Sequence, residues 1–262
     1  MHRPRNLTST GWEPRNDPAG TDKKYQMIKT AFFDFYNTLV RFWPPVDVIQ
    51  QASCREMGFR VSKVGIRKGY FLADDYMSRE NADGPLADRS PGERDRFFAE
   101  YERIILKGAG LEVTIRLAAQ IWEMASQVPK NFSLFEDVIP ALELLKKRDI
   151  TLGVTSNLRR DMGDLSKELG LDPYLDFYVT AAEAGAEKPH PPVFLAALKK
   201  AGVDPSEAIH VGDQYQADVQ GARAAGIVPV LLDREGWYTD VNDCSKINSL
   251  PELDGLLAQG LL

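Results

Sequence analysis

The chain of 262 residues is 44% hydrophobic and 27% charged, which is ordinary for one large or two small globular domains. Its formal net charge of −6, without a dense Lys/Arg block, argues against nucleic acid or an anionic membrane as partner, so we expect a small-molecule substrate. No apolar run reaches the roughly 18 to 20 residues of a membrane span and no signal peptide is recognisable, which predicts a cytoplasmic protein. Cys54 and Cys244 are far apart and are expected to be reduced thiols.

The N-terminal half of the chain changes character twice. Residues 1–26 are polar, rich in Pro, Arg, Asn and Gly, and lack periodicity, so they are predicted to be a disordered arm. Met27 directly precedes the apolar run Lys29–Phe33, a predicted buried strand with which the working domain is expected to begin. Residues 46–128 then show helical periodicity with many charges, which predicts an all-helical insert, here called the cap.

The rest of the chain alternates between strands and helices. This pattern predicts an α/β fold with a doubly wound parallel sheet, built from residues 27–45 and 129–262. The expected strands after the cap are Ile150–Thr155, Phe177–Thr180, Ala208–Val211 and Ile227–Leu232, and the expected helices include one around Val138–Leu145, one from about Arg159 to Leu169, one from Pro191 to Gly202 and one over Ala217–Ala225.

Four of the predicted strands are followed by a residue that can carry chemistry. Asp34 follows the first strand, Ser156 the second, Lys188 lies in the loop after the third, and Asp213 follows the fourth. Sites in open parallel sheets form beyond the carboxyl ends of the strands, where these loops converge. We therefore expect the four side chains to meet at one edge of the sheet.

These segments resemble the four motifs of the haloacid dehalogenase superfamily, in the same order. FFDFYNTLV is similar to the first, GVTSN to the second, EKP to the third and VGDQYQAD to the fourth, so the resemblance extends from Met27 to about Arg234. It implies a hydrolase with a Rossmann-like core and a helical cap. It also implies Asp34 as nucleophile, with Ser156, Lys188, Asp213 and Asp218 completing the site.

The chemistry of the side chains agrees with these roles. The Asp34 carboxylate can attack phosphorus or carbon and form a covalent intermediate that water hydrolyses. The Ser156 hydroxyl and the Asn157 backbone N–H can donate hydrogen bonds to substrate oxygens, and Lys188 supplies a compact positive charge. Thr38 is expected to bond around the nucleophile loop or to the substrate.

The charges of the predicted site favour a metal ion. Asp34, Asp213 and Asp218 bring three negative charges against the one positive charge of Lys188, and a phosphate ester would add nearly two more. Mg²⁺ takes oxygen ligands and can neutralise the excess. The expected ligands are Asp34, the backbone carbonyl of Tyr36, Asp213, and Asp218 either directly or through water.

Tyr36 leaves the reaction open. It faces the same site as Asp34, at the position where the superfamily's phosphatases commonly carry an Asp that protonates the leaving group. A tyrosine there is similar to the metal-independent 2-haloacid dehalogenases, which however lack the Gly-Asp pair present here as Gly212-Asp213. The metal-binding acids favour a Mg²⁺-dependent phosphatase of a small metabolite; the alternatives are a dehalogenase and a phosphate-binding or regulatory protein with little turnover.

Overall fold

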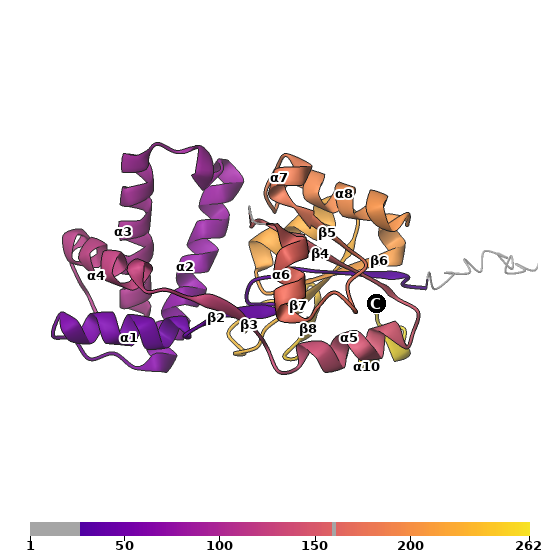
Figure 1. Cartoon of the computed structure of the whole chain (residues 1–262), viewed down its shortest axis with the longest axis horizontal. Coiled ribbons are helices and arrows are strands. Elements are labelled where there is room, and N and C mark those ends of the chain that lie inside the picture. The colour runs from indigo at the N-terminus through magenta and orange to yellow at the C-terminus, as the bar shows by residue number, and fades with distance from the viewer. Residues whose placement is uncertain (1–26, 159–160) are drawn as a thin grey trace, which may run out of the picture.

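The computed structural model of the chain describes residues 27–158 and 161–262 (Figure 1). The predicted disordered arm, residues 1–26, and the predicted start of a helix at Arg159 lie outside the described residues. Figure 1 shows two parts: a sheet flanked by helices, and a separate group of helices beyond one end of that sheet.

A six-stranded parallel sheet forms the centre of the larger part. Its strand order is β5-β4-β1-β6-β7-β8, with all pairs parallel, as the sequence predicted. The strands are β1 (Thr30–Phe33), β4 (Thr151–Ser156), β5 (Phe177–Thr180), β6 (Ala208–Gly212), β7 (Val228–Leu232) and β8 (Ser245–Ile247). All four residues of β1 are buried, because β1 lies between β4 and β6 and both of its faces are covered.

Helices cover both faces of the sheet, so successive residues of β1 enter different cores. Ala31 and Phe33 pack with Leu142 of one hydrophobic cluster, whereas Phe32 packs with Phe194 of another. The elements that flank the sheet are α5 (Val138–Lys146), α6 (Met162–Leu169), α7 (Ala181–Ala184), α8 (Pro191–Ala201), the 3₁₀ turn η2 (Pro205–Glu207), the π-helical turn η3 (Tyr215–Gln220), α9 (Gly221–Ala224) and α10 (Glu252–Ala258).

All regular elements within residues 46–128, the segment predicted as the cap, are helical. The segment contains α1 (Val46–Glu56), α2 (Lys63–Asp83), the 3₁₀ turn η1 (Leu86–Asp88), α3 (Pro91–Gly108) and α4 (Ile115–Gln127). Two strands that the sequence did not predict, β2 (Val40–Trp43) and β3 (Asn131–Leu134), pair antiparallel and connect it to the sheet (Figure 1). Gly69 lets α2 and α3 approach closely, because a Cβ at this position would lie 2.1 Å from the carbonyl oxygen of Ile105.

Two helix boundaries differ from those expected. Helix α6 begins at Met162, because the Asp161 side chain accepts hydrogen bonds from the N–H groups of Gly163 and Asp164 and so caps it. The helix expected over Ala217–Ala225 begins earlier, as the π-helical turn η3. No helix within the described residues combines the length and apolar character needed to span a membrane.

Candidate active site

Asp34 lies at the carboxyl end of β1, in the middle of the sheet. Its backbone N–H donates to the carbonyl of Val211 at 2.8 Å, which continues the pairing with β6 by one residue. The chain then turns sharply: Asn37 has a φ of 61° and its N–H donates to Val40 at 2.7 Å. This left-handed conformation suits asparagine and directs the residues after Asp34 into β2.

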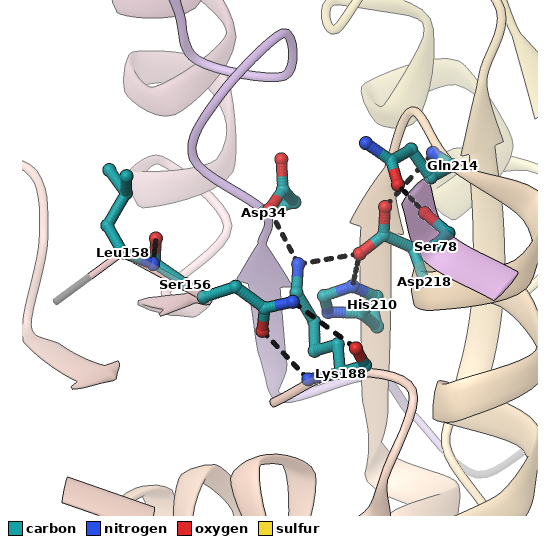
Figure 2. Close-up of polar contacts among 9 residues, drawn as sticks. Asp34, Ser78, Ser156, Leu158, Lys188, His210, Gln214 and Asp218 are labelled. Atoms are coloured by element: carbon teal, nitrogen blue, oxygen red, sulfur yellow. Dashed lines mark hydrogen bonds and ion pairs between the residues drawn. The ribbon is translucent and has the colours of Figure 1, made fainter. Parts of the chain in front are cut away.

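Lys188 bridges two carboxylates of the site (Figure 2). Its Nζ lies 2.5 Å from Asp34 Oδ1 and 2.7 Å from Asp218 Oδ1, and its side chain is only 3% exposed. Burial alone would lower the pKa of Lys188, but the charges of Asp218 and Asp34 raise it above its ordinary value. Lys188 therefore stays charged, and its charge is shared between two acids.

The Asn157 side chain fixes the loop that carries Lys188. Asn157 Oδ1 accepts from the Lys188 backbone N–H at 2.7 Å, and Asn157 Nδ2 donates to the Lys188 carbonyl at 3.2 Å. The amide side chain thus has a positioning role. The backbone N–H of Asn157, which the sequence suggested as a donor to substrate, is not involved in this clamp.

Asp218 is held on both of its oxygens. Oδ1 contacts Lys188 and the imidazole Nε2 of His210 at 3.0 Å, and Oδ2 accepts from the Gln214 N–H at 3.0 Å (Figure 2). Burial would raise its pKa, but Lys188 and His210 hold it below the ordinary value, so Asp218 is an anion. Gly212 makes room for it, because a Cβ there would lie 2.1 Å from Asp218 Cγ.

Asp213 completes the acidic cluster, but unlike Asp34 and Asp218 it does not contact Lys188. Ligand oxygens of Asp34, Asp213 and Asp218 lie within 4.8 Å of one another. Yet Asp213 Oδ1 is buried with no hydrogen-bond partner in the described part of the chain. Burial and the charges of Asp34 and Asp218 raise its pKa well above the ordinary value. Burial similarly raises the pKa of Asp34 to about 6, although Lys188 opposes this shift. An unpaired buried carboxylate beside other acids fits a divalent cation.

Two predicted hydroxyl residues also lie near the strand ends. Ser156 ends β4, and its Oγ accepts from the Leu158 N–H at 3.1 Å, which leaves the hydroxyl proton available for another acceptor (Figure 2). Thr38 is fully buried, and its Oγ1 has no partner within the described ranges. Its carbonyl accepts from Arg234 at 2.9 Å, so the loop after Asp34 is tied to the segment after β7.

A cavity of about 480 Å³ lies between the sheet end and the cap. Asp213 and Tyr36 line it from the sheet side, and α1 and α2 line it from the cap. The Tyr36 ring packs 4.7 Å from Phe42 and 6.4 Å from Phe132, measured between ring centroids. Burial, followed by the nearby acids, raises the pKa of Tyr36, so its hydroxyl is neutral.

Several residues of the site were not expected from the sequence as functional. His210, fully buried on β6, supports Asp218. Ser78 of the cap hydrogen-bonds to Gln214, which in turn holds Asp218 (Figure 2). Only the position of His210, two residues before Gly212 and so on the same side of the strand, could have suggested its contact.

The family is decided by a model of haloacid dehalogenase-like hydrolases that matches residues 28–226. The chain belongs to this family. Haloacid dehalogenase-like hydrolase domain-containing protein 3 of Bos taurus is 29% identical over 211 residues, covering 78% of this chain and 82% of the relative. Ribulose-1,5-bisphosphate 5-phosphatase of Halopiger xanaduensis is 30% identical over 220 residues, covering 79% of this chain and 85% of the relative.

Solved structures give the same fold. A 2-haloacid dehalogenase from Pseudomonas syringae is 28% identical with a TM-score of 0.54, and the match covers 89% of this chain and 99% of that one. A putative HAD-hydrolase from Bacillus subtilis, solved with magnesium, has a TM-score of 0.59 at 16% identity, with 88% of this chain and 99% of that one covered. The likeness to the second structure concerns the fold alone. The predicted hydrolase class and Rossmann-like core are therefore confirmed.

Proposed function

We propose that this hydrolase is a Mg²⁺-dependent phosphatase that acts on a small phosphorylated metabolite through a phosphoryl group on Asp34. The observation that carries the proposal is the pairing of the acids. Lys188 already contacts Asp34 and Asp218, whereas Asp213 Oδ1 is buried without a partner among the described residues. Among the described residues, Lys188 is the only Lys or Arg that pairs with these acids, so the cluster stays negative and an anionic ester could enter it only if a further cation were bound.

Asp34 and Asp213 are the ligands that best fit the cation, together with the backbone carbonyl of Tyr36. Both oxygens of Asp218 already accept hydrogen bonds, so we assign it to the cluster through water and through its contact with Lys188. When bound, Mg²⁺ would neutralise the charge of the carboxylates and of the phosphate. Residues that hold hard oxygen donors around one point suit this ion.

The remaining residues act on the phosphoryl group. Asp34 is the nucleophile, and the Lys188 charge stabilises the anion that develops on the phosphoryl oxygens. The Ser156 hydroxyl, whose oxygen accepts from the Leu158 N–H, donates a hydrogen bond to one of those oxygens. Thr38, with an unpartnered hydroxyl within the described residues, is a further substrate-binding candidate, as is the Asn157 N–H.

The relatives agree with phosphoryl chemistry without giving the substrate. The Halopiger relative carries the name of a ribulose bisphosphate phosphatase, and a 39% identical relative from Methanopyrus kandleri that of a glyceraldehyde 3-phosphate phosphatase. The latter match spans 108 residues, 41% of this chain and 46% of the relative.

A metal-independent dehalogenase is the second candidate. Tyr36 favours it, and so does the 28% identity with the Pseudomonas structure titled 2-haloacid dehalogenase. Halide leaves without a proton, so no acid would be needed at position 36. The Asp213 Oδ1 atom, buried without a partner among residues 27–158 and 161–262, speaks against it, because a metal-free site gains nothing from a buried carboxylate oxygen that lacks a partner.

One experiment separates the candidates. Purified protein should hydrolyse p-nitrophenyl phosphate or acetyl phosphate with Mg²⁺ and not in EDTA, and Asp34→Asn should abolish turnover. Chloride release from 2-chloropropionate in EDTA, without phosphatase activity, would establish the dehalogenase instead. If neither reaction occurs and inorganic phosphate raises the melting temperature, the protein is a phosphate binder with little turnover.

A further inference from the structure

One face of helix α2 lies against the sheet end that carries the site. Ser78 contacts Gln214, Phe71 packs 5.4 Å from Trp237 and 4.8 Å from Tyr238 between ring centroids, and Arg67 pairs with Glu235 at 2.9 Å. These three residues of α2 follow helical spacing, so they define the face that looks toward the larger part of the molecule.

Asp74 belongs to the same face of α2. It stands three residues after Phe71 and four before Ser78, and it lines the cavity together with Tyr36 and Asp213. Its neighbour Asp75 is paired differently, with Arg79 at 2.8 Å on the same helix. Asp74 is therefore a carboxyl group of the cap that lines the same cavity as Asp213, and the helix that carries it also packs on η3, which holds Asp218.

The surroundings of Asp74 suit proton transfer. The Tyr101 hydroxyl of α3 donates to Asp74 Oδ1 at 2.5 Å, whereas Oδ2 has no hydrogen-bond partner within residues 27–158 and 161–262. No basic side chain of these residues forms an ion pair with it. Burial raises the pKa of Asp74 to about 6, in the range where a carboxyl group can both hold and release a proton near neutral pH.

The geometry of phosphoryl transfer gives this carboxyl a role. The attacking and leaving oxygens lie roughly in line through phosphorus, so a leaving group expelled by Asp34 departs on the side away from the sheet. That side is the cavity beneath α2. Tyr36 stands at the position where the family's phosphatases commonly carry the acid, and burial keeps its hydroxyl weakly acidic. The proton must then come from elsewhere.

We propose that Asp74 is the general acid of the reaction and protonates the leaving-group oxygen from the cap. The proposal rests on the proposed phosphatase function. In the first step an Asp34 oxygen forms a bond to phosphorus, the bond from phosphorus to the ester oxygen breaks, and the Asp74 proton passes to that oxygen. In the second step water attacks phosphorus, its proton returns to Asp74, and the Asp34 oxygen leaves as carboxylate with release of inorganic phosphate.

The dependence on the leaving group tests the proposal. Phenyl phosphate and p-nitrophenyl phosphate are similar in size, but phenolate is the poorer leaving group and needs the proton more. Asp74→Asn should lower kcat/KM for phenyl phosphate by about 10²- to 10⁴-fold, the range for general acid catalysis, and that for p-nitrophenyl phosphate by less than about tenfold. Asp83→Asn, the same change at the exposed end of α2, should alter neither.

Two further variants keep the test decisive. Asp74→Glu retains an acid and should recover part of the loss on phenyl phosphate. Tyr101→Phe removes only the hydroxyl that orients Asp74 Oδ1, so it should also reduce turnover of phenyl phosphate more than that of p-nitrophenyl phosphate. Equal losses on both esters, or no loss, would overturn the role of Asp74 while leaving the phosphatase proposal intact. A wild-type protein inactive on both esters with Mg²⁺ would overturn both proposals.

Discussion

Replacing Lys188 by methionine tests the charge arrangement of the site through stability rather than turnover. Methionine retains much of the volume but removes the ammonium group that lies 2.5 Å from Asp34 Oδ1 and 2.7 Å from Asp218 Oδ1. Two buried carboxylates would then face each other without compensation. Removal of one partner of a buried ion pair typically costs about 3–5 kcal/mol, so the free energy of unfolding at pH 8 should fall by about that amount.

The loss should depend on pH, and its sign follows from the pKa shifts. Lys188 holds the Asp218 pKa below its ordinary value, so this carboxylate stabilises the wild-type fold above that value and the contribution is lost as pH falls. Without Lys188, the pKa values of Asp34 and Asp218 should both rise, and protonation near pH 5 should relieve the repulsion. The variant should therefore be closer to the wild type in stability at pH 5 than at pH 8.

Urea unfolding in EDTA at the two pH values measures both effects. Lys200→Met is the matched control, because Lys200 is 40% exposed and pairs with Glu183 at the surface, where an ion pair contributes about 0–1 kcal/mol. A Lys188→Met variant as stable as the wild type at pH 8, or a loss that is the same at both pH values, would refute the bridging position of Lys188.

Two further predictions concern Gly212 and Asp213. Gly212→Ala should displace Asp218, lower the free energy of unfolding in urea by about 1–3 kcal/mol and reduce turnover. Gly92→Ala, whose new Cβ would meet no atom within 4 Å, should lower neither stability nor turnover. Wild-type activity in Gly212→Ala would contradict this. Burial raises the pKa of Asp213, so at pH 8 the ionised carboxylate is favoured more in the unfolded state than in the folded state and lowers the stability of the fold. Asp213→Asn should therefore unfold at a higher urea concentration than the wild type at pH 8 in EDTA. A lower urea midpoint for the variant would show that the carboxylate has a stabilising partner.

The position of the site could be predicted from the sequence because it follows from topology. Asp34 and Asp213 directly follow strands, Ser156 ends one and Lys188 lies in a loop beyond another, and parallel pairing brings strand ends to one edge. The strands themselves were recognisable as apolar runs between polar turns. The three-residue β8 and the four-residue β2 and β3 were missed, because each mixes apolar with polar residues and is too short to show an apolar run or a period of its own.

The contribution of the cap could not be predicted in the same way. Asp74 and Ser78 lie on a helix with a weak apolar stripe, and nothing local marks the face that turns toward the sheet. Their relation to Gln214 and Asp213 depends on how two distant segments dock. The partners of His210 and Asn157 depend similarly on side-chain directions that spacing alone does not give.

Mg²⁺ binding to the protein without substrate, measured by isothermal titration calorimetry, tests the central claim most directly. The buried Asp213 Oδ1, which lies beside Asp34 and has no partner in the part of the chain that the structure describes, predicts that the wild type binds Mg²⁺. Asp213→Asn should lose this binding, while Asp83→Asn, a change at an exposed residue, should retain it. Wild-type protein that binds no Mg²⁺, or Asp213→Asn protein that binds it as tightly as the wild type, would contradict the assignment of this acidic cluster as a metal site.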